Sequence, residues 1–129
     1  FYLVREARAH SITISPIPGP TASISALVAS GFPTDRFTFL GFLSKKQKRR
    51  KDQLKEIAAA QITTIIYESP YRIHKLLKDM QDTIPRCNIC IARELTKRFE
   101  EFLIGAPQDI IAKLEDKTLK GEITVIISP

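Results

Sequence analysis

The chain has 129 residues, of which 43% are hydrophobic, and its 20 lysines and arginines exceed its 14 acids to give a net charge of +6. This length is enough for one sizeable core and some additional residues. The apolar runs are strand-sized, far below the roughly 20 residues of a membrane-spanning helix, and Arg5, Glu6 and Arg8 interrupt any signal-peptide core. We therefore expect a soluble, cytoplasmic protein without a membrane partner.

The chain begins with a segment that looks incomplete. Residues 1–10, FYLVREARAH, have the apolar spacing of a helix but no capping residue before it. We interpret them as the end of a helix whose beginning is missing, which predicts that the chain is a fragment of a longer protein. Residues 11–15 alternate as a short strand would. The proline-rich residues 16–20, PIPGP, predict a rigid turn that marks a boundary.

The next residues predict a helix, a strand and a second helix. Thr21 is placed to start a helix that Gly31 ends. The aromatic-rich residues 37–43 predict a strand. Ser44 is then expected to cap a long helix whose later turns carry the apolar residues that dock it.

The start of that long helix concentrates the positive charge of the chain. Residues 44–51, SKKQKRRK, hold six bases, and the rest of the chain carries 14 bases and 14 acids. Such a local concentration indicates binding to a polyanion, although a solvated helix face is the alternative. The predicted RNA contacts, called the basic cluster below, are Lys45, Lys46, Lys48, Arg49, Arg50 and Lys51.

A buried strand and the start of a helix follow one another closely at residues 62–78. Residues 62–67 are almost continuously β-branched or aromatic, Ser69 is a natural N-cap, and Pro70 suits the first helical position. Glu68 ends the strand, and Arg72 is expected in the first helical turn, where a cation opposes the dipole. Either the two side chains pair across the turn, or they face a ligand at the carboxyl end of the strand.

Two cysteines, Cys87 and Cys90, form a C-x-x-C pattern that in general indicates zinc or thiol chemistry. The sequence has no second ligand pair, and the two cysteines open a strand, where residues three apart point to opposite faces. We therefore predict buried core cysteines in a reducing compartment, with no metal. His10 and His74 stand alone, and neither is expected to be catalytic.

The remaining residues complete an α/β pattern. Residues 88–93 predict a strand that ends in a polar stretch, and residues 99–104 predict a second strand too close in sequence for a helical crossover, hence antiparallel. A short helix is expected at 107–114 and a buried last strand at 122–128. Five strands and three helices after residue 36 predict an α/β domain with a mixed sheet and packed helices.

Six stretches in order, PIPGPTA, GFPTDRFTFLGFLSKK, YESPYR, ARELTK, EEF and GEITVII, resemble the small-subunit ribosomal RNA (cytidine-2′-O)-methyltransferases of the tetrapyrrole methylase superfamily. The resemblance covers essentially the whole chain, with Thr21 where the family usually has Ser and Tyr71 where His is common. It implies a homodimeric enzyme that binds S-adenosylmethionine between two α/β domains and acts on ribosomal RNA or the small ribosomal subunit. Residues 1–35 would be the end of an incomplete first domain and the linker, and residues 36–129 the second domain.

The resemblance also implies roles for individual residues. Catalytic roles fall on Glu68, Arg72, Glu94 and Lys97. Contacts to the cofactor fall on Pro18, Gly19, Pro20, Thr21, Ala22, Ser69, Arg93, Thr96, Gly121 and Glu122. Deprotonating a ribose hydroxyl requires a base, and the sequence does not select among Glu68, Glu94 and Lys97.

Two alternative functions are compatible with the sequence. The first is a methyltransferase for a tetrapyrrole or another small molecule, against which the basic cluster counts, because a small-molecule site needs no basic arm. The second is a non-catalytic module for RNA binding or dimerisation.

Overall fold

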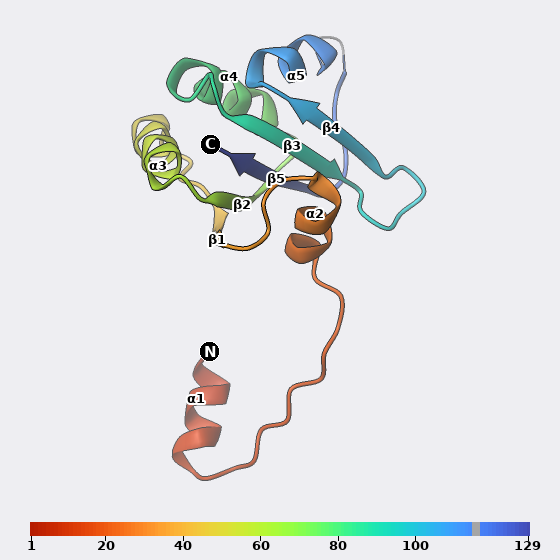
Figure 1. Cartoon of the computed structure of the whole chain (residues 1–129). Helices are drawn as coiled ribbons and strands as arrows, with labels where there is room; N and C mark the ends of the chain where they lie inside the picture. The colour runs from red at the N-terminus through yellow and green to blue at the C-terminus, as the bar shows by residue number, and fades with distance from the viewer. Residues whose placement is uncertain (115–116) are drawn as a thin grey trace.

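The computed structural model describes residues 1–114 and 117–129. Its centre is a five-stranded sheet in the order β1-β2-β5-β3-β4 (Figure 1). Strands β1 and β2 are parallel, β5 runs antiparallel to β2 and β3, and β4 runs antiparallel to β3. The strands are β1 (Phe37–Phe42), β2 (Thr63–Glu68), β3 (Asn88–Arg93), β4 (Glu101–Gly105) and β5 (Ile123–Ser128). The predicted mixed sheet is therefore confirmed.

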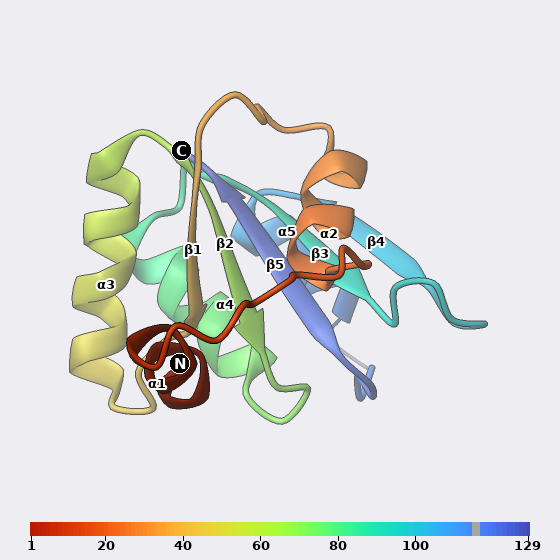
Figure 2. The same cartoon turned by 90° about the horizontal axis from the view of Figure 1, so that it is seen from below.

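Helices cover both faces of the sheet unequally (Figures 1 and 2). Within the described residues the helices are α1 (Tyr2–Ala9), α2 (Ala22–Ser30), α3 (Gln47–Ala60), α4 (Ile73–Thr83) and α5 (Pro107–Leu114). Helices α3, α4 and α5 share a core with Val125 of β5, whereas α2 packs on the opposite face against the neighbouring Ile126. Successive residues of β5 are thus buried on opposite faces, which explains why residues 123–127 are all buried.

Helix α2 belongs by its packing to the sheet. Ala26 and Leu27 are buried against Ile65 and Ile126. The residues that pack on the sheet therefore begin with α2, whereas the sequence predicts the division between the two domains at residue 35. That division remains a prediction.

The segment before α2 differs from its prediction. No residue of α1 is buried, and the chain from residue 12 to residue 21 has no regular structure as it leads to α2 (Figure 1). The predictions of a strand at 11–15 and of a turn at 16–20 are therefore both wrong. The physical reason is the spacing of Pro16, Pro18 and Pro20, because each proline fixes its own φ and drives the residue before it toward an extended conformation.

The start of α3 also differs from its prediction. Lys46 is the N-cap and makes no capping hydrogen bond with its side chain. Ser44, the predicted cap, lies two residues earlier, where its hydroxyl accepts a hydrogen bond from the Lys46 N–H at 3.2 Å.

The two cysteines lie in the core, as predicted. Cys87 packs in the cluster beneath α3, α4 and α5, and Cys90 packs in the cluster beneath α2. Burial raises the pKa of both thiols, that of Cys90 to about 11, which keeps them protonated and unreactive at neutral pH. In the described part of the chain, no group of three or more His, Cys, Asp or Glu residues is placed to hold a metal ion. None of the described helices is long and apolar enough to cross a membrane.

Candidate functional site

Strands β1, β2 and β3 end on the same side of the sheet, and β5 begins on that side. This strand-end side is called the edge of the sheet here. The register places Ile123 of β5 between Glu68 of β2 and Arg93 of β3. A cavity of about 370 Å³, here called the cleft pocket, opens at this edge. Its lining residues are Ala22, Phe42, Tyr67, Glu68, Ser69, Pro70, Gly121, Glu122, Ile123 and Thr124. The volume lies in the range of small-molecule sites.

The cleft pocket gathers part of the predicted site. Five residues with predicted catalytic or cofactor roles line it, and they are Ala22, Glu68, Ser69, Gly121 and Glu122. The sequence did not point to the two aromatic residues of the wall, Phe42 and Tyr67, because an aromatic residue within a strand is equally typical of a packed core. The signal that could have identified them is their position at the carboxyl ends of two parallel strands, where open α/β folds bind ligands.

Glu68 is the most unusual residue of the cleft pocket. Its side chain is 1% exposed, and its Oε1 accepts a hydrogen bond from the Ser69 N–H at 2.7 Å. Its other oxygen, Oε2, is buried without a hydrogen-bond partner among the described residues. Burial raises the pKa of Glu68, against the opposing effects of the Ser69 N–H and the Arg72 cation. The pocket thus contains a desolvated carboxylate with free acceptor capacity.

Arg72 lies beside Glu68 and does not line the cleft pocket. One guanidinium nitrogen, Nη2, lies 3.2 Å from Glu68 Oε2 in an ion pair without hydrogen-bond geometry, since it donates to the Leu43 carbonyl at 3.0 Å. The pairing across the turn is therefore present. Because the same carboxylate lines the pocket, this pairing does not exclude a ligand.

The helix after Glu68 starts later than predicted. Arg72 is the N-cap of α4, and Pro70 lies in the preceding turn rather than at the first helical position. Ser69 closes that turn, because its carbonyl accepts hydrogen bonds from the N–H groups of Arg72 at 2.9 Å and Ile73 at 3.0 Å. The side chain of Arg72 thereby reaches back to the strand instead of standing in the first helical turn.

Three charged side chains form a strand-end cluster next to the cleft pocket: Glu94, Lys97 and Glu122. Glu94 Oε1 accepts hydrogen bonds from the Glu122 N–H at 2.9 Å and from Lys97 Nζ at 3.0 Å, and Lys97 Nζ also lies 3.0 Å from Glu122 Oε2. The Glu122 N–H, followed by Lys97, lowers the pKa of Glu94. Glu94, followed by Glu122, raises the pKa of Lys97. Both groups are therefore held in their charged forms at neutral pH.

Gly121 is required for this cluster. Its φ is +91°, and a Cβ at this position would collide with the carboxylate of Glu94. Only glycine allows the backbone before β5 to approach that close while adopting this φ.

We expect Gly121→Ala to lower the free energy of unfolding by more than the roughly 1–3 kcal/mol of a strained φ, because the clash adds to the strain. Gly31→Ala is the matched control, since Gly31 has a φ of +75° but open space around its missing Cβ. Urea unfolding of both variants measures the difference. Equal losses would show that Glu94 moves aside without cost.

The other residues with predicted cofactor roles lie outside the cleft pocket. Arg93 pairs with Glu101 at 3.0 Å, and Thr96 lies exposed in the following loop with a φ of +64°. The exposed segment 18–20 leads to Thr21, whose hydroxyl caps α2 by accepting a hydrogen bond from the Ile24 N–H at 3.4 Å.

The basic cluster divides into two groups. Arg50 is buried and donates from Nε to Asp79 Oδ2 of α4 at 2.7 Å, and Lys51 pairs with Asp82 at 2.8 Å. Arg50 is therefore corrected from a phosphate contact to a structural residue, and Lys51 is engaged within the fold. The four residues that remain exposed are Lys45, Lys46, Lys48 and Arg49.

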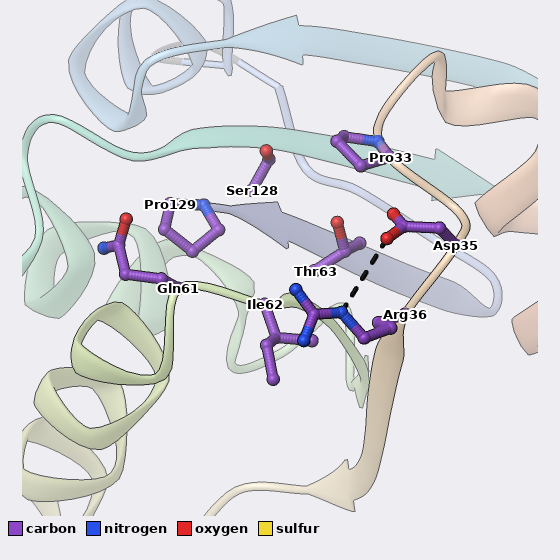
Figure 3. Close-up of a pocket in the computed structure, with 8 residues that line it drawn as sticks. All are labelled: Pro33, Asp35, Arg36, Gln61, Ile62, Thr63, Ser128 and Pro129. Atoms are coloured by element: carbon purple, nitrogen blue, oxygen red, sulfur yellow. Dashed lines mark ion pairs between the residues drawn. The ribbon is translucent and has the colours of Figure 1, made fainter.

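A second hollow lies at the opposite edge of the sheet (Figure 3). It measures about 130 Å³ and includes the exposed pair of Asp35 and Arg36, together with Thr63 and Ser128 at the far ends of β2 and β5. None of the residues with predicted functional roles lines it. Its small volume makes it a poor site for a ligand of cofactor size.

Comparison with known proteins identifies relatives along nearly the whole chain. The family model described as Tetrapyrrole (Corrin/Porphyrin) Methylases matches residues 1–110. The proteins named Ribosomal RNA small subunit methyltransferase I from Halalkalibacterium halodurans and Vibrio cholerae are 40% and 44% identical to this chain, each over 98% of its length. The chain spans only 44% and 45% of the lengths of these two relatives.

Solved structures of low sequence identity share the fold. The methyltransferase CobJ matches with a TM-score of 0.67 and 19% identity, over 98% of this chain and 56% of that chain. The uroporphyrin-III C-methyltransferase of Thermus thermophilus, complexed with S-adenyl homocysteine, matches with a TM-score of 0.53 and 13% identity, over 95% of this chain and 56% of that chain. These structures show the fold alone, and the family model that matches residues 1–110 shows that the chain belongs to the tetrapyrrole methylase family.

Proposed function

We propose that this chain is part of an S-adenosylmethionine-dependent enzyme that methylates the 2′-hydroxyl of a cytidine in small-subunit ribosomal RNA. Three findings support the proposal: the family match, the names of the relatives at 40% and 44% identity, and the cleft pocket at the strand ends. The single observation that carries the chemistry is Glu68 Oε2, a buried oxygen that accepts no hydrogen bond from the described residues and has only the Arg72 cation beside it.

Glu68 is the best base among the three residues left open by the sequence. A general base works well when its pKa is raised toward neutrality, and burial raises the pKa of Glu68. Lys97 is held protonated, and the pKa of Glu94 is lowered, so both are weaker proton acceptors at neutral pH. In this proposal Glu68 Oε2 accepts the proton of the ribose hydroxyl, and the deprotonated ribose oxygen is then the nucleophile.

The residues of the cleft pocket fit a sulfonium cofactor. Phe42 and Tyr67 offer aromatic rings, which attract cations, and the carboxylates of Glu68 and Glu122 add negative charge. Gly121 keeps the backbone free of a side chain at the rim. Bound there, S-adenosylmethionine supplies an electrophilic methyl group. The protein holds the two reactants together, which removes several kcal/mol of the entropic barrier.

The direct test is a methylation assay with the full-length protein and methyl-labelled S-adenosylmethionine. Assembled small subunits, naked small-subunit RNA and corrinoid precursors are offered separately. We expect label in an RNA fraction at a ribose oxygen, identified by nuclease digestion and mass spectrometry. Label in the corrinoids alone would contradict the RNA substrate, and no label in any substrate would contradict the enzyme.

The four exposed residues of the basic cluster are expected to bind RNA phosphates. Replacing Lys45, Lys46, Lys48 and Arg49 by Gln should weaken RNA binding and flatten its dependence on salt. For single-stranded RNA, the slope of log affinity against log salt should fall by about 0.7 per lost contact. Fluorescence anisotropy across a salt series measures both quantities.

Lys55→Gln, on the exposed side of the same helix beyond the cluster, is the matched control. Cofactor affinity should be unchanged in both proteins, because the cluster does not line the cleft pocket. A slope equal to that of the control would mean that the cluster is only a solvated helix face.

A further inference from the structure

A third hollow, not used by the proposed chemistry, lies between the β3–β4 loop and the segment that leads into β5. It measures about 500 Å³. It is called the Phe99 hollow here, and its lining residues are Arg93, Phe99, Glu101, Lys117, Thr118, Leu119 and Lys120. Arg93 ties its two sides together, because Nη1 donates to the Lys120 carbonyl at 3.2 Å and Nε bonds Glu101 at 3.0 Å.

The hollow combines an exposed aromatic ring with exposed cations. Phe99 is 63% exposed, and the guanidinium of Arg98 lies over its ring, 5.6 Å from the centroid. Lys117 and Lys120 are exposed, and within the described residues neither they nor Arg98 forms an ion pair. Glu101, the acid of the hollow, is already paired with Arg93. Within residues 1–114 and 117–129, the surface therefore carries positive charge that no ion pair neutralises, around an aromatic face.

This combination matches the chemistry of a nucleotide in a single strand. An unpaired base stacks on an aromatic ring, and the phosphates of the same strand bind nearby lysines and arginines. An acidic polypeptide satisfies the cations but offers no base to the ring. The exposed aromatic residue beside three cations therefore favours a single-stranded nucleic acid.

The position of the hollow indicates which nucleotide it holds. Lys120 lines the Phe99 hollow, and the next residue, Gly121, lines the cleft pocket. Glu122 of the strand-end cluster also lines the cleft pocket. We propose that the Phe99 hollow binds a nucleotide that neighbours the methylated one, with its base on Phe99 and its phosphate at Lys120 and Arg98. This proposal rests on the RNA substrate proposed above.

The test uses the full-length protein and a fluorescein-labelled single-stranded RNA of about twelve nucleotides, a length that covers one such site. Phe99→Ala should weaken binding about tenfold with an unchanged salt slope, because stacking releases few ions. Phe99→Tyr should retain binding. Lys120→Gln should weaken binding and lower the salt slope by about 0.7. Lys75→Gln, on the exposed side of α4, is the control for charge.

The outcomes separate this inference from the proposed function. If the wild-type protein methylates small-subunit RNA and Phe99→Ala and Lys120→Gln bind the oligonucleotide as the wild type does, the hollow is not a nucleotide site and the proposed function stands. If Phe99→Tyr loses as much affinity as Phe99→Ala, stacking is contradicted. A wild-type protein that neither binds nor methylates RNA overturns both proposals. Circular dichroism of each variant excludes unfolding as the cause.

Discussion

Glu68→Gln is expected to lower the kcat of methyl transfer by about 10²–10⁴, the range that a positioned general base contributes. The amide is nearly isosteric with the carboxylate, so the cleft pocket keeps its shape while losing its proton acceptor. Cofactor affinity should change much less than kcat, and calorimetric titration with S-adenosylmethionine measures that affinity. Single-turnover methylation with saturating cofactor measures the chemical step.

The same substitution should leave the fold more stable at neutral pH. Burial raises the pKa of Glu68 above its ordinary value of 4.5, so the folded protein holds this proton more tightly than the unfolded chain. The stability that this group contributes is present below that value and is lost as the pH rises through the raised pKa. Glutamine never ionises. The higher melting temperature of Glu68→Gln should therefore appear at pH 7 and vanish on acidification below about pH 4.5.

Glu56→Gln, an exposed glutamate on α3, is the matched control for the chemical change. It should leave both kcat and melting temperature unchanged. If Glu68→Gln instead retains kcat and melts at a lower temperature than the wild type at pH 7, Glu68 serves only as the partner of Arg72. The opposite signs expected for activity and stability make these two roles separable.

Asp79→Ala is expected to produce the largest loss of stability. Asp79 and Arg50 are 2% and 7% exposed, and the carboxylate accepts hydrogen bonds from Arg50 Nε at 2.7 Å and Gln47 Nε2 at 3.0 Å. Removing the carboxylate leaves a buried guanidinium without its counter-charge, which typically costs about 3–5 kcal/mol. That cost is a large part of the roughly 5–15 kcal/mol by which a native protein is stable. Urea unfolding measures the loss.

Two variants test the cause of that loss. Asp35→Ala removes one acid from the exposed pair with Arg36 and should have no measurable effect on unfolding. The double variant Arg50→Met with Asp79→Leu removes both charges, and it should recover most of the stability, because replacing a buried pair by apolar residues is often neutral. If the double variant is as unstable as Asp79→Ala, packing and not the unpaired charge is the reason.

The strands and the edge that carries the site were predictable from local pattern. The apolar run before Glu68 predicts a strand buried on both faces, and the rule that open α/β sheets bind ligands at strand ends leads to Glu68. Ser69 and Gly121, which also line the pocket, were implied by the family resemblance and not by this rule. Phe42 and Tyr67 were missed because an apolar side chain in a strand looks the same in sequence whether it faces a core or a pocket.

The errors came from contacts between residues distant in sequence. Arg50 looked like its neighbours in the basic cluster, and only the fold brings Asp79, 29 positions away, to its guanidinium. Likewise Arg72 was assigned to a helical turn because the bond from its side chain to the Leu43 carbonyl, also 29 positions away, has no local signature. Charge counts and helix propensities describe single segments and cannot identify such partners.

The sheet has its last strand at its centre. β5 comes after the other four in the chain and yet pairs with both β2 and β3. As the ribosome releases the chain, a β1–β2 unit and a β3–β4 hairpin precede β5, each with an unpaired row of backbone groups that is prone to wrong pairing. The sheet therefore cannot form completely until residues 123–128 have been synthesised. Pairing of this short segment with β2 and β3 then joins two separate halves into one cooperative unit.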